Sequence, residues 1–131
     1  MRHADRDAIS ESECWALLAT ESVGRLAVSI RALPAILPVQ YYVDGDEIAL
    51  CLGQHSVPSQ AITNTIVAFS ADAIDTTTSQ GWSVQVQGSI RPPRPTGTPA
   101  ECGQPTGGQI VHIDPATITG QHLRICPILS F

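Results

Sequence analysis

The chain has 131 residues, 43% of them apolar and 15% charged, which is the composition of one globular domain rather than of a disordered segment. Seven Arg and no Lys stand against 12 Asp plus Glu, and the net charge of −5 makes nucleic acid and anionic membrane surfaces poor partners. No apolar stretch reaches the roughly 20 residues of a membrane-spanning helix, and residues 1–7 lack the apolar segment of a signal peptide, so we expect a cytoplasmic protein.

A short helix that begins after Ser10 is the first predicted element, and residues 1–9 before it are expected to form an N-terminal extension. Ser10 and Glu13 form the Ser-x-x-Glu pattern of a capping box, in which the Ser side chain accepts from the backbone N–H of the Glu. Trp15 and Leu18 lie on one apolar side of this helix. Such a helix needs a sheet to pack against.

Strands are predicted from residue 24 onwards. The segments 24–30 and 34–43 are rich in β-forming residues, and Asp44-Gly45 then marks a tight hairpin turn into a return strand over 47–52. Pro58 is suited to the first turn of a second short helix.

The second half of the chain supplies the remaining strands. Residues 92–108 hold five Pro and four Gly, so no long helix or central strand fits there, and we expect a loop. About six strands and two short helices describe a compact antiparallel β-barrel that fills a single domain over residues 1–131. The β-rich segments are 66–71, 82–90, 109–113 and 117–125, with Asp114-Pro115-Ala116 as a turn between the last two.

Metal-binding and disulfide-forming side chains are scattered along the chain. The four Cys and the four His form no close pair of the kind that zinc sites use, so no metal site is expected. In a cytoplasmic protein we expect the cysteines to be reduced and to fill small apolar spaces. They are Cys14, Cys51, Cys102 and Cys126.

Several stretches between residues 10 and 122 stand in a characteristic order and spacing. They are 24–27, 34–45, 67–69 with 72–75, 81–84 with Gly88, 111–115 and 118–120. Together they resemble the pyridoxamine 5'-phosphate oxidase-like family of FMN-binding split barrels, of which this chain looks like a small, divergent member.

The resemblance implies a mainly β fold, a six-stranded antiparallel split β-barrel with two short helices that pairs as a homodimer. It also implies a small-molecule ligand between the subunits: flavin mononucleotide (FMN), or a deazaflavin coenzyme in some branches. A bound flavin would carry the redox chemistry of an oxidoreductase, whose substrate the resemblance does not name. The cofactor-binding residues that it implies here are Gln40, Tyr42, Gly53, His55, Ser56 and Trp82.

Some of these positions have a second interpretation. Gln40 and Tyr42 share one face of their strand, where they line a flavin pocket or else face solvent or the partner subunit. Trp82 either stacks on a ring or packs in the core or in an interface.

The chain departs from its relatives where they hold the flavin phosphate. In relatives a basic residue followed by Thr ends the return strand, and a Lys follows in the next loop. Cys51, Leu52 and Val57 stand at these positions, and His112 stands where relatives often have Arg. Because a phosphate dianion binds best to charge-assisted donors, an alternative function stays open. That alternative is a cofactor-free barrel that binds or transforms a small apolar molecule without redox chemistry.

Overall fold

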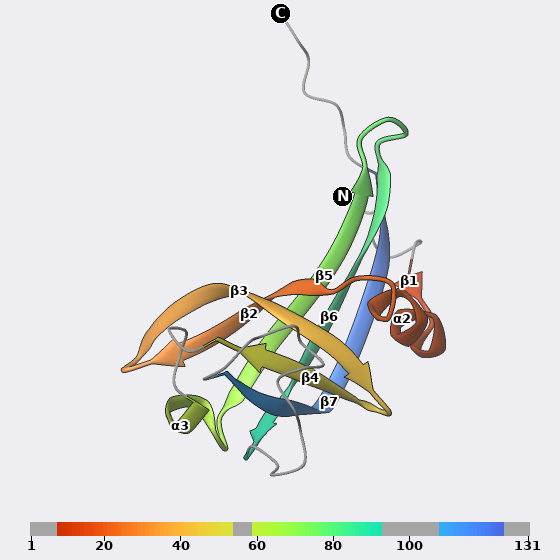
Figure 1. The fold of residues 1–131 in the computed structure, drawn as a ribbon. Coiled ribbons are helices and arrows are strands. Elements are labelled where there is room, and N and C mark those ends of the chain that lie inside the picture. The colour runs from red at the N-terminus through yellow and green to blue at the C-terminus, as the bar shows by residue number, and fades with distance from the viewer. Residues whose placement is uncertain (1–7, 54–58, 93–107, 125–131) are drawn as a thin grey trace, which may run out of the picture.

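The structure is a computed structural model, and it describes residues 8–53, 59–92 and 108–124 (Figure 1). The helix α2 is the only one longer than a single turn in these three segments. None of the helices found there is long and apolar enough to cross a membrane. In chain order the elements are β1 (Ala8–Ile9), α2 (Glu11–Leu18), β2 (Val23–Ile30), β3 (Leu33–Asp44), β4 (Glu47–Leu52), α3 (Ser59–Ile62), β5 (Ile66–Asp75), β6 (Gln80–Arg91) and β7 (Gln109–Arg124).

All the strands pair antiparallel in one sheet, in the order β1-β7-β4-β3-β2-β5-β6. Because β6 also pairs with β7, six of the seven strands close into a ring, and β1 is added outside it on β7. The prediction of a mainly β, antiparallel fold is therefore confirmed. The predicted hairpin at Asp44-Gly45 is also confirmed: it joins β3 to β4, with Gly45 at a φ of 63°.

The core lies inside the ring, where alternate residues of the strands meet. Its largest fully buried side chain is Phe69, whose ring lies edge-on to that of Tyr41 with the ring centroids 4.8 Å apart. Leu18 of α2 and Ile62 of α3 are also fully buried in this core. Each helix therefore contributes a side chain to the same apolar cluster.

The helix α2 begins as the sequence predicts. The Ser10 hydroxyl accepts a hydrogen bond from the backbone N–H of Glu13 at 3.3 Å. At the other end, the Tyr41 hydroxyl donates to the carbonyl oxygen of Leu18 at 2.6 Å, so a carbonyl that the helix itself leaves free gains a partner. Burial, with smaller contributions from Glu13 and Glu11, raises the pKa of the Cys14 thiol above its ordinary value.

One predicted turn is wrong. Asp114-Pro115-Ala116 lies inside the single long strand β7 rather than between two strands. On β6, Gln87 pairs with Thr117, and the next residue, Gly88, pairs with Pro115. Ala116 is therefore an extra residue on β7 and forms a β-bulge. A bulge accommodates proline, which has no N–H for the ladder, and β7 can therefore continue through it.

Where the second helix is predicted, the described residues hold only the single turn α3, and Pro58 lies outside them, so the second helix stays a prediction. Most of the Pro/Gly-rich segment predicted as a loop lies outside them as well, at 93–107.

The hairpin of β2 and β3 reaches sideways beyond the other strands of the ring (Figure 1). Ile30 pairs with Leu33, so only Arg31 and Ala32 make the turn. Both residues are left-handed, with φ of 53° and 64°, as this kind of two-residue turn requires. Leu33 beside the turn is 71% exposed, so the end of this hairpin carries apolar surface away from the core.

Candidate functional site

A second, smaller apolar cluster lies on the outside of the ring. Ala49, Cys51 and Ile110 are buried there with Tyr42 packed against them, although they alternate along their strands with residues of the main core. In one row across the strands, Tyr42 of β3 pairs with Ala49 of β4, and Ala49 pairs with His112 of β7. In the next row, Gln40 pairs with Cys51, and Cys51 pairs with Ile110. We call these six residues the outer strip: Gln40, Tyr42, Ala49, Cys51, Ile110 and His112.

Exposure changes across the outer strip. Gln40 is exposed and Tyr42 is half-buried, whereas the four residues from β4 and β7 are buried. Every residue of β4 is buried, on whichever face it lies. The strip therefore has a small apolar floor, with polar side chains at its borders.

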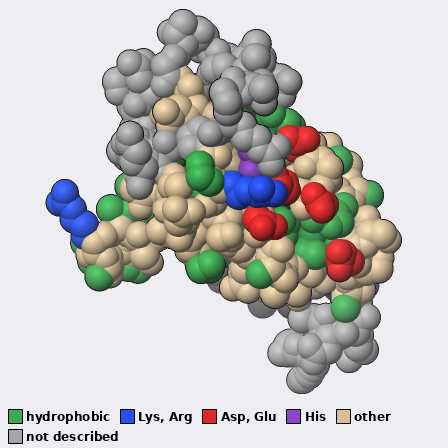
Figure 2. Space-filling view, turned by 90° about the horizontal axis from the view of Figure 1, so that it is seen from below, with side chains coloured by type: hydrophobic (Ala, Val, Ile, Leu, Met, Phe, Trp, Pro, Cys, Tyr) green, Lys and Arg blue, Asp and Glu red, His purple; other side chains and the backbone are tan. Residues whose placement is uncertain are grey.

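A network of charged and polar side chains adjoins the strip, on the face where a histidine, an arginine and several acidic side chains gather (Figure 2). The Nε2 atom of His112 lies 2.9 Å from Oδ2 of Asp44, and Arg91 forms an ion pair with Glu47. His112 is only 3% exposed and Glu47 only 6%. The network thus links β3, β4, β6 and β7 on one face of the sheet.

The residues predicted to bind a cofactor are distributed as follows. Gln40 and Tyr42 lie together on the outer strip, and Gly53 follows directly after β4. His55 and Ser56 lie outside the described residues. Trp82 lies on β6, in register with Ala73 and His122, and packs against the main core, so the structure does not bring it to the strip.

Sequence reasoning missed the polar network. The sequence indicates only a turn at Asp44, and no local pattern gives Glu47 or Arg91 a functional role. The available signal was the period of two along β3, which places Asp44 on the same face as Tyr42 and Gln40. What the sequence does not contain is the register that brings His112 within hydrogen-bond distance of Asp44, 68 residues away.

The cysteine prediction is wrong for Cys51, which is disulfide-bonded. Its side chain lies on the outside of the ring, where another part of a chain can reach it, whereas the free Cys14 is enclosed in the main core. Cys102 and Cys126 lie outside the described residues.

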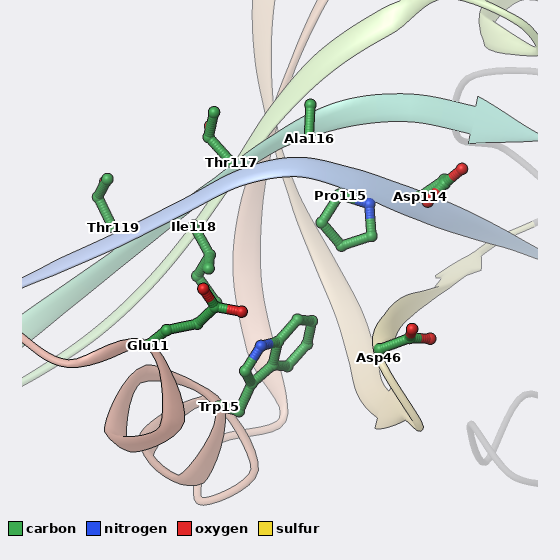
Figure 3. A pocket seen from close by; sticks show the side chains of 9 residues that line it. All are labelled: Glu11, Trp15, Asp46, Asp114, Pro115, Ala116, Thr117, Ile118 and Thr119. Atoms are coloured by element: carbon green, nitrogen blue, oxygen red, sulfur yellow. The ribbon is translucent and has the colours of Figure 1, made fainter.

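A cavity of about 510 Å³ lies between α2 and β7 (Figure 3). The Trp15 indole forms one wall, and the carboxylates of Glu11, Asp46 and Asp114 come from three separate parts of the chain. Its lining within the described residues includes no Lys, Arg or His. Its size is that of a small-molecule pocket, but its three carboxylates do not suit a phosphate-bearing ligand.

The outer face of β2, β3 and β5 forms a different kind of surface. A shallow depression of about 180 Å³ lies there, lined by Arg25, Ala27, Ile36 and neighbouring residues. Ile36 and Ile66 on this face are each 73% exposed. Isolated apolar residues are normal on a protein surface, but several on one sheet face indicate a contact surface.

Comparisons with known proteins agree on the family. The family model described as pyridoxamine 5'-phosphate oxidase matches residues 10–102. No curated protein matches the sequence.

Solved structures with the same fold cover nearly the whole chain. An FAD-binding protein from Mycobacterium smegmatis is 30% identical, with 89% of this chain and 99% of that protein covered and a TM-score of 0.74. A candidate pyridoxamine 5'-phosphate oxidase from Corynebacterium glutamicum is 24% identical over 92% and 95% of the two chains, with a TM-score of 0.72. An FAD-binding protein from Mesorhizobium loti is 17% identical over 88% and 94%, with a TM-score of 0.71.

Proposed function

Since the chain belongs to the pyridoxamine 5'-phosphate oxidase family, we propose that it is a flavin-binding split-barrel protein that acts as a flavin-dependent oxidoreductase. The outer strip is the proposed flavin site. The observation that carries the proposal is that the Mycobacterium smegmatis relative, covered over 99% of its length, is an FAD-binding protein. A bound flavin would supply electron transfer, and the residues of the chain would bind and orient it.

The residues of the strip fit the ring part of a flavin better than its phosphate. Ala49 lies between Tyr42 and His112 but is fully buried, so a flavin ring would contact the strip at its accessible border, where Gln40 and Tyr42 lie. At the end of β4, however, Cys51 and Leu52 provide no charged donor for a phosphate. The fit therefore supports flavin binding in which the ring contributes more than the phosphate.

This asymmetry predicts a preference among flavins. The terminal phosphate of FMN is a dianion that needs cationic partners, whereas each phosphate of FAD carries one charge and its adenosine adds contact area. We therefore propose FAD rather than FMN or a deazaflavin as the bound form, in keeping with what the Mycobacterium smegmatis relative binds.

We also propose that the chain forms a homodimer through the outer face of β2, β3 and β5. The exposed side chains of Ile36 and Ile66 support this surface, since pairing two copies would remove both from water.

An absorbance spectrum of the purified protein, followed by titration with FAD, FMN and a deazaflavin coenzyme, tests the proposed function. We expect saturable FAD binding that Gln40→Ala weakens about tenfold, since Gln40 is the exposed polar border of the strip. The matched control is Gln80→Ala, another exposed glutamine at the start of β6, which should leave binding unchanged. A protein that binds none of the three cofactors would refute the proposal.

A second candidate function is the binding of a small apolar molecule without a cofactor. The buried apolar floor of Ala49, Cys51 and Ile110 favours it, as does the lack of a cationic residue at positions 51 and 52. This candidate predicts a colourless protein that does not bind flavins but binds an apolar dye such as Nile red saturably. Tyr42→Ala should then weaken dye binding.

A further inference from the structure

The cavity between α2 and β7 occupies a gap in the wall of the ring (Figure 3). On one side, β7 pairs with β6 through the whole of this region. On its other side, β4 pairs with residues 109–113 and β1 with residues 120–121, so residues 114–119 have no second strand neighbour within the described segments. All six of these residues line the cavity. Six strand residues extend over about 20 Å, so the fold builds the cavity as a slot between the ends of β4 and β1.

The carboxylates of the slot lie at its two ends. Glu11 stands two residues after Ile9, which pairs with Gly120, and so it lies at the β1 end. Asp46 directly precedes β4, and Asp114 directly follows the part of β7 that pairs with β4, so both lie at the other end. None of the three carboxylates forms an ion pair or a side-chain hydrogen bond with another described residue. Both ends of the slot therefore carry negative charge that no protein cation balances.

An aromatic ring lies between these two ends. Figure 3 shows the Trp15 indole between the side chains of Glu11 and Asp46. Trp15 packs against the main core but is only half-buried, so part of its ring is open to the slot. The face of an indole attracts cations, as carboxylates do, and the lining as a whole favours a positively charged ligand. The volume of about 510 Å³ is that of a small-molecule site.

The positions of the carboxylates decide which kind of cation fits. No three His, Cys, Asp or Glu side chains of the described residues lie together as ligands for a metal ion. A metal ion, like the ammonium group of a monoamine, could reach only one end of the slot. A linear polyamine carries ammonium groups at both ends of an apolar chain, and that chain can lie across an indole ring.

We propose that the slot is a binding site for a linear aliphatic polyamine. One terminal ammonium group pairs with Glu11, the other pairs with Asp46 and Asp114, and the chain between them lies over Trp15. The lining of the slot contains none of the six residues of the outer strip, so this site is separate from the proposed flavin site and does not depend on it.

Isothermal titration calorimetry with spermidine, putrescine and butylamine tests the proposal, because these amines differ in length and in charge. We expect saturable binding of spermidine, with a dissociation constant on the order of 0.1–1 mM. The shorter putrescine cannot reach both ends, and we expect it to bind at least threefold more weakly than spermidine. Butylamine, with a single charge, should bind at least tenfold more weakly than spermidine.

Two variants and a matched control locate the binding. Glu11→Gln combined with Asp46→Asn should weaken spermidine binding about tenfold, and should fold normally because both side chains are exposed. Trp15→Phe, which keeps a smaller aromatic ring, should weaken it about threefold. The control is Glu13→Gln combined with Asp75→Asn, which removes the same charge from exposed positions outside the slot and should leave binding within about twofold of the parent.

Three results would overturn the proposal. If spermidine binding does not saturate at about 5 mM, the slot is not a polyamine site. An equal loss of affinity in the control variant would show that amines are attracted only by the net negative charge of the chain. Finally, a peptide of alternating Lys and Ala that binds more tightly than spermidine would show that the open side of β7 takes an added strand instead.

Discussion

Tyr41 connects the sheet to the end of α2, and its hydroxyl makes this connection only in the protonated form. Burial, with a smaller contribution from Glu21, raises the pKa of Tyr41 from 10.0 to about 12. The folded protein therefore holds the phenol proton more tightly than the unfolded chain does. The resulting stability is fully present below pH 10 and is lost as the pH rises through 12.

Urea unfolding between pH 8 and pH 12 should show this effect. Two pKa units correspond to about 3 kcal/mol, so the unfolding free energy should fall by up to that amount over the alkaline range. Tyr41→Phe should be about 1 kcal/mol less stable at pH 8, because the carbonyl of Leu18 loses the shorter of its two hydrogen bonds and keeps only the one from the backbone N–H of Glu21, and should lack this alkaline loss. An unchanged alkaline slope in the variant would contradict the assignment to Tyr41.

The candidate site was predictable from the sequence only in part. The period of two along β3 puts Gln40 and Tyr42 on one face, and the structure confirms that they share it. The contact between His112 and Asp44 depends on how β7 aligns with β4 and β4 with β3, which no local pattern encodes. For Trp82 the limit is different. The alternation of apolar and polar residues that begins at Trp82 and Ser83 is visible in the sequence, but the sequence does not show that the face with Trp82 is turned towards the core.

Among the elements, the β2–β3 turn is the one whose sequence suits it least. Two-residue hairpin turns of this kind favour Asn and Gly, because both central residues need positive φ, yet Arg31 and Ala32 occupy these positions. A left-handed conformation costs an ordinary residue about 1–2 kcal/mol.

Ala32→Gly should therefore stabilise the protein by about 1 kcal/mol, measured as a rise in the urea midpoint with an unchanged slope. The matched control is Ala27→Gly, in the middle of β2, which should destabilise the protein by a similar amount, since glycine weakens a strand. A loss of stability in Ala32→Gly would show that this turn stores no strain.

The bulge in β7 explains why sequence reasoning expected a turn there. Inward residues are Val111 and Ile113 before the bulge but Ile118 after it, so the alternation changes phase at residues 114–117. A change in the alternation of inward and outward residues with a Pro near its centre is also typical of a turn between two strands. Only the long-range pairing with β6 distinguishes a bulge from such a turn.

Gly88 should be indispensable to the bulge. A Cβ atom at this position would collide with the backbone of Asp114, which cannot move without disturbing the strand. Gly88→Ala is expected to cost about 1–3 kcal/mol of unfolding free energy, whereas Ser89→Ala next to it should cost under 1 kcal/mol. A Gly88→Ala variant as stable as the parent would mean that the strands are further apart than described.

At the scale of the whole molecule, substitutions on the outer face of β2, β3 and β5 test whether the proposed dimer forms through that face. Ile36→Glu combined with Ile66→Glu should leave the fold intact, because both side chains are exposed, but should weaken dimerisation at least tenfold by placing charges in the interface. Sedimentation velocity measures the change, and Thr78→Glu in the exposed β5–β6 turn is the control. A double variant that remains as dimeric as the parent would rule out this surface.

The length of the chain around Ala116 has a consequence for how such sequences can diverge. Because Ala116 is the one extra residue, a chain without it would pair Pro115 and Thr117 with Gly88 and Gln87 as direct neighbours, and Ile118 would still face inward. The loss of one residue at position 116 is therefore compatible with the same fold, as a regular strand without the bulge. Elsewhere in β7 a single insertion or deletion would exchange the two faces of the strand, so we expect such changes to be confined to the bulge.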